Sequence, residues 1–254
     1  MLWLSLFIAV AVMFAGWIWQ CRQQNAGIVD VLWAFNLGLI AIIYAVFSDG
    51  SVMLRVLIAI IMGGWYLRLS WHLARRVLAE PEDGRYRYLR QHWGENADQN
   101  LLWFFLAQAI LAWLLALPAW VIANGNIEQL QPQHVLALLL ALGAFVGVNI
   151  ADQQLHAFRS DPANKGKVCE TGLWFYSRHP NYFFEWLHWF SYPILAIGLN
   201  YGAWLWLAPL VMLAFLYFIS GIPYTEQQAL RSRGDAYRRY QQTTSPFIPW
   251  RKRS

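Results

Sequence analysis

The stretch that decides the fold is residues 134–157, which read HVLALLLALGAFVGVNIADQQLHA. Before Asp152 it contains no acidic or basic side chain apart from one histidine. About 20 mostly apolar residues are enough for a helix to cross a membrane. A strand is disfavoured, because lipid leaves the polar groups at a sheet edge unsatisfied. The stretch predicts a spanning helix whose last turns place Asn149, Asp152 and His156 on one face.

The whole chain has a membrane composition. Of its 254 residues, 58% are hydrophobic and 13% charged, whereas soluble domains carry about a quarter charged residues. The 16 Trp, 12 Tyr and 15 Phe agree, since aromatic side chains favour membrane–water boundaries. The prediction is an all-α polytopic membrane protein in one domain, residues 1–254, with the first apolar segment retained as a helix. The seven predicted spans are 2–20, 27–47, 52–78, 101–123, 134–157, 181–199 and 202–222.

Basic residues predict the orientation, because they concentrate in cytoplasmic loops. With seven crossings, the basic residues other than Arg55 and Arg68 fall on the side of the C-terminus. The C-terminus is therefore expected to be cytoplasmic and the N-terminus outside. A polar segment, residues 224–242, predicts a C-terminal amphipathic helix at the cytoplasmic surface, with Trp250 beyond it near the interface. The net charge of +5 then indicates a membrane rather than nucleic acid.

Ionisable side chains inside predicted spans mark a site by default, because they are costly there. Snorkelling and ties between helices would explain any one of them. A single water-accessible cavity explains all of them together. These polar residues of the cytoplasmic half are Asp30, Arg68, Asn149, Asp152, His156, Asn181, Glu185 and His188.

The densest motif is the loop of residues 161–182, DPANKGKVCETGLWFYSRHPNY. Pro180 suits the first turn of a helix, where backbone amides and the helix dipole favour an anion. The basic residues around this end are Lys165, Lys167, Arg178 and His179. A phosphate-bearing ligand is the expected occupant. Positive charge on the cytoplasmic side would explain the lysines alone, but not Asn181 and Glu185. No Gly-rich nucleotide motif and no metal-ligand spacing is evident, so no metal is predicted.

Several segments resemble the bacterial branch of the steroid 5-alpha-reductase family. They are residues 151–155 (ADQQL), 164–167 (NKGK), 171–174 (TGLW), 177–186 (SRHPNYFFEW), 232–237 (SRGDAY) and 246–250 (PFIPW). The family has seven helices and a cytoplasmic C-terminus, and it uses NADPH to reduce an activated carbon–carbon double bond of a 3-oxo-Δ4 steroid. The resemblance implies an oxidoreductase in a membrane, the bacterial inner membrane by this branch, that takes a lipophilic substrate from the bilayer.

The resemblance also implies site residues. Arg68 and Arg85 look like the family's basic residues in and after the third helix, and Lys167 and His179 join the set through the phosphate argument. The predicted cofactor contacts are Arg68, Arg85, Asn149, Asp152, Arg159, Lys167, Ser177, Arg178, His179, Asn181, Tyr182 and Glu185. In the eukaryotic members an acid and a tyrosine contact the steroid ketone. The nearest positions here are Asp30 and Tyr66, although neither fits the family pattern fully.

The reaction explains why an acid and a tyrosine are useful. Hydride delivery to the β-carbon of an enone places negative charge on the ketone oxygen, and a proton donor there stabilises the enolate. Tyr66 supported by Asp30 is the predicted donor. Within the single domain, residues 1–100 would then form the substrate side and residues 101–254 the cofactor side.

A rival interpretation remains, because Arg178 to Tyr182 also match membrane methyltransferases of the isoprenylcysteine carboxyl and phospholipid type. Those enzymes use S-adenosylmethionine and carry a late glutamate and tyrosines, as Glu226, Tyr237 and Tyr240 do here. Residues 152–154 and the many cations favour the phosphorylated dinucleotide. A non-enzymatic sterol or lipid binder is the third possibility. The natural substrate and the oligomeric state stay open, as does the packing partner of residues 143–147.

Overall fold

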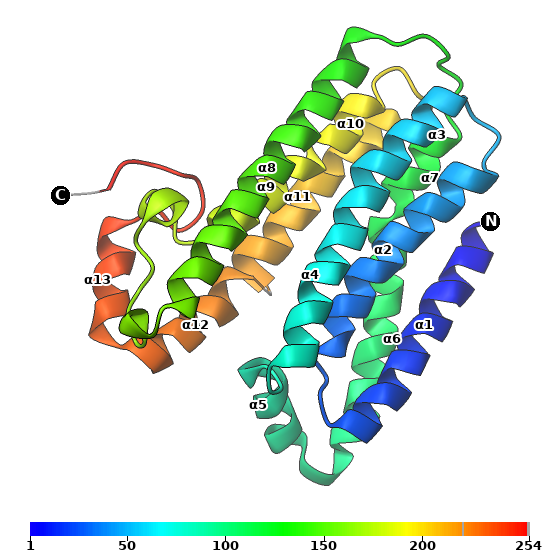
Figure 1. Ribbon diagram of the computed structural model, residues 1–254. Helices are drawn as coiled ribbons and strands as arrows, with labels where there is room; N and C mark the ends of the chain where they lie inside the picture. Colours follow the sequence, from blue (N-terminus) through cyan, green and yellow to red (C-terminus); the bar gives the residue numbers. More distant parts are fainter. Residues whose placement is uncertain (220, 253–254) are drawn as a thin grey trace. The chain divides into compact units, whose positions relative to one another are not determined.

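The computed structural model describes residues 1–219 and 221–252 (Figure 1). Over these residues the chain is helical, and its only strand-like pairing is an isolated bridge between Ser177 and Ser245. The predicted class, an all-helical integral membrane protein, is confirmed by six helical segments that are long and apolar enough to cross a membrane. They are Leu2–Gln23, Ile28–Phe47, Val52–Ala79, Gly84–Ala123, Pro132–Ser160 and Gly202–Arg233. Arg253, one of the basic residues assigned to the cytoplasmic side, lies outside the described residues.

The remaining predicted span, residues 181–199, forms two shorter helices, α9 (Pro180–Trp189) and α10 (Ser191–Leu195). Pro193 explains the break, because it has no amide hydrogen to offer the Trp189 carbonyl four residues earlier. Neither piece alone is long enough to cross about 30 Å of hydrocarbon. The count of seven crossings therefore stays a prediction.

The helices group into two compact units. Unit 1 comprises Met1–Gln131 and Ala196–Ala203, and unit 2 comprises Pro132–Leu195 and the chain from Trp204 onward. The expected division of roles fell after residue 100. The helix that spans this position, Ala97–Leu115, packs against the first two helices, so by its contacts it belongs to unit 1.

Unit 1 is built around its second helix, which contacts the first, fourth and sixth. Its helices are α1 (Leu2–Gln23), α2 (Ile28–Phe47), α3 (Val52–Ile58), α4 (Trp65–Ala79), α5 (Gly84–Trp93), α6 (Ala97–Leu115) and α7 (Leu117–Ala123). A π-helical turn, Ala59–Gly64, joins α3 to α4. Gly38 lets α4 approach α2 closely, since an added Cβ would lie 3.0 Å from the Leu67 backbone nitrogen. This contact sets the register of α2 against α4.

Ion pairs close one end of unit 1. Arg90 lies 3.0 Å from Glu82 and 3.4 Å from Asp98, and it donates to the Gln20 side chain at 3.0 Å. Glu82 also accepts a hydrogen bond of 2.8 Å from the Ala26 amide. Because each charge has an opposite partner, this network can hold α5 and α6 to the turn between α1 and α2 without leaving a buried charge uncompensated.

Unit 2 is organised along its longest helix, α8 (Pro132–Ser160), against which α9 and α10 pack (Figure 1). Helix α11 (Leu207–Ala214) then packs on α9. Gly147 permits the close approach of α9, because an added Cβ would lie 2.3 Å from the Phe184 ring. A Cβ at Gly143 would meet no described atom within 4 Å. Of the two glycines in residues 143–147, Gly147 thus packs a helix within unit 2.

The polar segment predicted as one helix over residues 224–242 is present as two, α12 (Ile222–Arg233) and α13 (Asp235–Thr243). They separate at Gly234, whose φ of +53° is readily adopted only by glycine. Tyr237 and Tyr240 of α13 pack with Ala229 of α12 in a small hydrophobic cluster. This cluster holds the two helices together and leaves the α13 arginines exposed.

Candidate functional site

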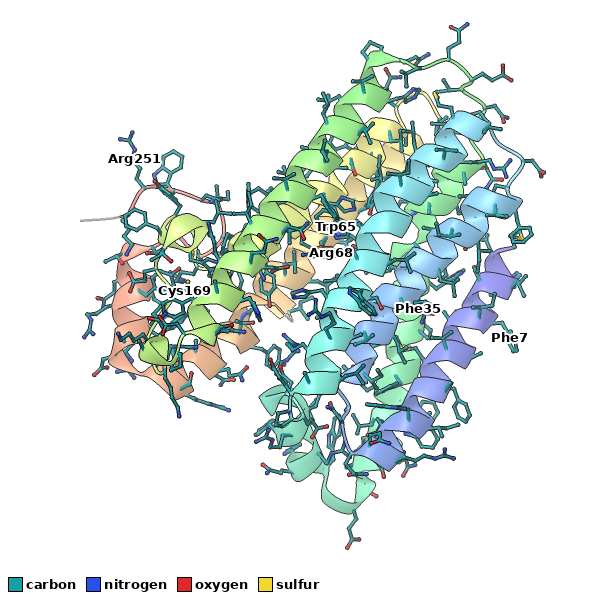
Figure 2. All side chains as sticks on the ribbon, in the orientation of Figure 1. Phe7, Phe35, Trp65, Arg68, Cys169 and Arg251 are labelled. Carbon is teal, nitrogen blue, oxygen red and sulfur yellow. The ribbon has the colours of Figure 1, made fainter. Side chains whose placement is uncertain are left out.

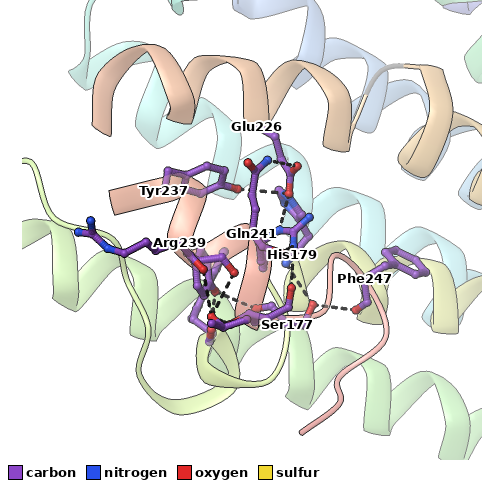
Figure 3. Close-up of polar contacts among 12 residues, drawn as sticks. Ser177, His179, Glu226, Tyr237, Arg239, Gln241 and Phe247 are labelled. Atoms are coloured by element: carbon purple, nitrogen blue, oxygen red, sulfur yellow. Dashed lines mark hydrogen bonds and ion pairs between the residues drawn. The ribbon is translucent and has the colours of Figure 1, made fainter. Parts of the chain in front are cut away.

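Glu226 of α12 is the centre of a polar cluster in unit 2 (Figure 3). Its Oε1 atom lies 2.6 Å from Arg178 Nε and 3.2 Å from His179 Nε2, and it accepts from the Tyr237 hydroxyl at 3.4 Å. Its Oε2 atom accepts from Gln241 Nε2 at 2.7 Å. Both carboxylate oxygens are therefore engaged, and Glu226 joins α12 to α13 and to the start of α9.

Arg178 is a buried cation whose partners are all within unit 2. Besides the contact with Glu226, its Nη1 atom donates to the carbonyl oxygens of Gln241 and Thr244, at 2.9 and 2.6 Å. A charge is stable in such a place only when it is paired and hydrogen-bonded. The sequence predicts a cofactor contact here. In the structure the guanidinium group is already engaged, so a positioning role accounts for its contacts.

The C-terminal tail clamps the residues that precede α9. Ser177 Oγ donates to the Phe247 carbonyl at 2.7 Å and accepts from the His179 amide at 3.1 Å. The Arg178 amide donates to the Ser245 carbonyl at 2.9 Å. Ser177 is buried by these contacts, which fix the backbone conformation at the entry to α9.

Two buried tyrosines of α13 complete the clamp. The Tyr240 hydroxyl donates to the carbonyl oxygens of Trp174 and Ser177. Burial raises the pKa of Tyr240 well above its usual value. Burial also raises the pKa of Tyr237, and the neighbouring Glu226 carboxylate raises it further. Both phenols therefore stay protonated at neutral pH and act as hydrogen-bond donors.

His179 and Tyr182 form a stacked pair at the start of α9, with ring centroids 5.3 Å apart and planes 8° apart. The Tyr182 hydroxyl is 3.1 Å from Thr225 Oγ1 on α12. Burial lowers the pKa of His179, although the hydrogen bond to Glu226 opposes this shift. His179 is therefore a neutral ring at pH 7, and it contributes geometry rather than positive charge.

The other two predicted residues of α9 lie on its half-buried side. Asn181 Oδ1 accepts a 3.0 Å hydrogen bond from the Tyr182 amide, which is one of the amides at the start of the helix. Glu185 Oε1 accepts from Trp189 Nε1 at 3.3 Å. Asn181 and Glu185 are each partly exposed.

The predicted residues of α8 form a stripe of increasing exposure. Asn149 and Asp152 are half-buried and Arg159 is exposed. Asn149 donates to the Phe145 carbonyl at 2.7 Å. Gln154, which lies between Asp152 and Arg159 on α8, accepts a hydrogen bond of 2.8 Å from the Leu173 amide through its Oε1 atom. This contact attaches the loop before α9 to α8. The sequence counted Gln154 with residues 152–154 as favouring a dinucleotide, and it did not predict this contact with the loop.

Exposed cations surround the polar end of unit 2. Lys167 is exposed, and its carbonyl oxygen accepts a 2.9 Å hydrogen bond from Arg233 Nε. The exposed basic residues of this region are Arg159, Lys165, Lys167, Arg231, Arg238, Arg239 and Arg251. They exceed the nearby acids in number, so the surface is positive and suited to phosphate groups.

The remaining predicted residues, Asp30, Tyr66, Arg68 and Arg85, belong to unit 1. Asp30 lies 3.0 Å from Arg85 Nη2 and accepts from the Tyr86 hydroxyl at 2.7 Å. Tyr66 is fully buried, and its ring meets Trp33 edge-on at 5.9 Å. Arg68 is half-buried on α4 (Figure 2).

Asp30 and Tyr66 are separated along the helices. Gly38 of α2 faces Leu67 of α4. Asp30 is eight residues away from Gly38 on α2, which corresponds to about 12 Å along the axis at 1.5 Å per residue. The predicted pair is therefore not in hydrogen-bond contact, and the phenol that the carboxylate contacts is that of Tyr86.

Fold and site together describe an integral membrane protein with a buried polar cluster beside a positively charged surface. The chain belongs to a family described as "Protein of unknown function (DUF1295)", whose model matches residues 16–244. No curated protein and no solved structure matches the chain significantly.

The sequence analysis named Glu226 only as a glutamate shared with membrane methyltransferases. It did not predict that Glu226 is the centre of a polar cluster. Gln241 received no role at all. The signal for Glu226 was an acid, one of two with Asp235, in a segment rich in arginine, where a counter-ion is expected. Its partner could not be chosen from the sequence, because several arginines were equally plausible.

Proposed function

We propose that this protein reduces an activated carbon–carbon double bond of a 3-oxo-Δ4 steroid or a similar lipophilic enone, with NADPH as the hydride donor. The main support is the positive surface around a rigidly held helix start in unit 2. Asn181 and Glu185 offer partly exposed polar groups there, and exposed cations such as Arg159 and Lys167 lie in the same unit. The resemblance of residues 177–186 to the steroid 5-alpha-reductase family supports the same reaction.

The residues present fit a phosphorylated dinucleotide by their chemistry. Phosphates bind cationic side chains, and exposed basic residues such as Lys165, Lys167 and Arg231 offer positive charge in unit 2. Arg178 and His179 serve differently, because the first is engaged by Glu226 and the second is neutral. They would position the start of α9, while Asn181, Glu185 and Asp152 would contact the cofactor. NADPH would supply the hydride, and the protein would supply orientation and charge stabilisation.

The proposal also requires seven crossings, with the N-terminus outside and the C-terminus cytoplasmic. Support comes from α9 and α10, which together follow α8. With the residues up to Leu199 they form a stretch of about 20 residues, enough for one crossing despite the break. With this additional crossing the count is seven, and the cations of unit 2 would then lie on the cytoplasmic side, where NADPH is found. The helices α12 and α13 would then lie at the cytoplasmic surface.

On the substrate side, we propose Tyr66 as the group that protonates the enolate oxygen. Its phenol lies deep in the apolar part of unit 1, where a lipophilic ring system would be stable. Asp30 is engaged by Arg85 and Tyr86. It would then act on the polar rim of the substrate path rather than on Tyr66 directly.

A second candidate function is methyl transfer from S-adenosylmethionine. The observation in its favour is the contact of Arg178 with Glu226 and the packing of Tyr237 beside them, since membrane methyltransferases share this combination of residues. S-adenosylmethionine carries no phosphate, so the exposed cations would have no role in that reaction. For this reason the reductase remains the preferred proposal.

Binding distinguishes the two functions before any substrate is known. Purified protein in detergent would be titrated with NADPH and, separately, with S-adenosylmethionine, and then supplied with a 3-oxo-Δ4 steroid. We expect saturable NADPH binding and a reduced steroid product. Methyl transfer without NADPH binding would overturn the proposal.

Two variants test the assigned contacts, each beside a matched control. Asn181→Ala removes a hydrogen-bonding amide and Glu185→Gln removes a carboxylate charge, so each should weaken NADPH binding about 5- to 30-fold, the equivalent of about 1–2 kcal/mol. Asn126→Ala and Glu128→Gln are the controls, since both residues are exposed in a loop of unit 1. Equal affinities for the four variants would show that α9 does not contact the cofactor.

A further inference from the structure

A patch of aromatic and basic residues lies on unit 2, outside the Glu226 cluster. It comes from two segments that the tail joins, since the Trp250 amide donates to the Tyr176 carbonyl at 2.9 Å. The exposed side chains of the patch are Phe175, Tyr176, Ile248, Trp250 and Arg251. Trp250 is 71% exposed, so most of its apolar surface is available to lipid or to a ligand.

The patch has a hollow with a cation at its edge. Tyr176, Pro249, Trp250 and Arg251 line a hollow of about 490 Å³. The Arg251 side chain extends away from the helices of unit 2 (Figure 2). Lys252 lies over the Phe175 ring and pairs with Glu170, so its charge is already compensated. Arg251 is therefore the exposed charge that a ligand in the hollow would meet.

The level of the patch relative to the membrane can be inferred from helix α8. This helix has 29 residues, about 43 Å at 1.5 Å per residue, so it is longer than the roughly 30 Å hydrocarbon core. Its side chains are uncharged from Val135 to Ala151, and the polar part begins at Asp152. Trp174 Nε1 donates to the Ala151 carbonyl at 2.9 Å. The residues that follow Trp174 therefore lie near the level where the apolar part of α8 ends.

We propose that this patch lies in the headgroup layer of the membrane and binds the phosphate of an anionic phospholipid, with Arg251 as the cation and Tyr176 and Trp250 against the upper acyl chain. Aromatic rings favour this layer because one end is apolar and the other polar. A basic residue near an anionic leaflet adds electrostatic attraction. The tail would thus fasten the polar end of unit 2 to the lipid surface.

The first experiment measures depth. In a background of Cys21→Ser and Cys169→Ala, a nitroxide would be attached at Trp250→Cys and, as the control, at Asp235→Cys. Asp235 has a side chain that is 80% exposed and lies outside the patch. In vesicles of phosphatidylcholine and phosphatidylglycerol, we expect the label at 250 to be shielded from a water-soluble nickel chelate and the label at 235 to be accessible. Equal accessibility of both labels would overturn the proposal.

The second experiment measures lipid preference by native mass spectrometry of protein taken from the same vesicles. Retained phosphatidylglycerol should fall about fivefold in Arg251→Gln, the equivalent of about 1 kcal/mol for one basic residue at an anionic surface. Phosphatidylcholine should not change. The control is Arg231→Gln, an exposed cation on α12. Equal loss in both variants, or retention without regard to headgroup charge, would overturn the proposal.

A further arm separates a lipid from free phosphate. Glycerol phosphate would be added to the protein before the measurement, at the same concentration as the phosphatidylglycerol headgroups. We expect it to displace little phosphatidylglycerol, because it lacks the acyl chains that Tyr176 and Trp250 would contact. Full displacement would mean that the hollow binds phosphate alone. Trp250→Ser, with its side chain exposed in the parent, should reduce retention without lowering the melting temperature.

Discussion

The Nε atom of Arg178 lies 2.6 Å from the Oε1 atom of Glu226, although 48 residues separate the two in the chain. Their side chains are 9% and 14% exposed, so water screens the pair only weakly. Removing one member of such a pair leaves the other charge buried. The contact therefore controls the stability of the polar end of unit 2 more than a surface ion pair would.

Glu226→Gln should destabilise the protein by about 3 kcal/mol, because the Arg178 charge stays buried without its counter-ion. The measurement is thermal unfolding in detergent. Glu170→Gln is the matched control, since Glu170 is 39% exposed in its pair with Lys252 and surface pairs contribute about 1 kcal/mol or less. Similar melting temperatures for the two variants would contradict the prediction.

His179 should make stability depend on pH between 7 and 5. Burial lowers its pKa in the folded protein, whereas an unfolded histidine has a pKa of about 6.5. As the pH falls through this range, the unfolded chain binds a proton that the folded chain resists, so stability decreases. The melting temperature should fall more steeply for the parent than for His179→Gln. Parallel curves would show that His179 does not contribute.

Gly147→Ala should destabilise unit 2 by about 1–3 kcal/mol, because the added methyl group would overlap the Phe184 ring and force the helices apart. Gly143→Ala is the control on the same helix. Its Cβ would meet no described atom within 4 Å, so we expect unchanged or slightly higher stability. Thermal unfolding of the two variants side by side checks this, and a neutral Gly147→Ala would refute the close contact.

Tyr66→Phe should slow steroid reduction about 100-fold while NADPH binding stays nearly unchanged, if Tyr66 protonates the enolate as proposed. Tyr44→Phe is a suitable control, because Tyr44 is also a buried tyrosine of unit 1 and lies 2.6 Å from the Ser5 hydroxyl. Losing that hydrogen bond should cost about 1 kcal/mol of stability and no turnover. Full activity of Tyr66→Phe would exclude it as the donor.

Much of the fold was predictable because membrane-spanning helices follow from apolar length alone. Six of the predicted spans have a long helix in the structure. For the remaining span, residues 181–199, the break into two helices could not be predicted, because the effect of Pro193 depends on whether neighbouring groups replace the lost hydrogen bond. The break at Gly234 was likewise hidden, since a glycine inside a polar helical pattern is often tolerated.

Less of the candidate site was predictable. Spacing predicted one stripe for Asn149, Asp152 and His156, and all three lie on the single helix α8, because helix periodicity is a local property. The partners of Arg178 come from α12, α13 and the tail, and no local pattern specifies them. The pairing of Asp30 with Tyr86 instead of Tyr66 depends on the path of the loop before α5, which hydrophobic periodicity does not encode.

The short turn of Ala196–Ala203 lies between α10 and α11 in sequence but belongs to unit 1. Its Leu199 side chain lies where a Cβ on Gly125 would be, 2.7 Å away. No single cut of the polypeptide can therefore yield both units intact, since a fragment ending at Gln131 would lack this turn. During synthesis, unit 1 must likewise wait for residues that emerge after much of unit 2, so the two units cannot mature strictly one after the other.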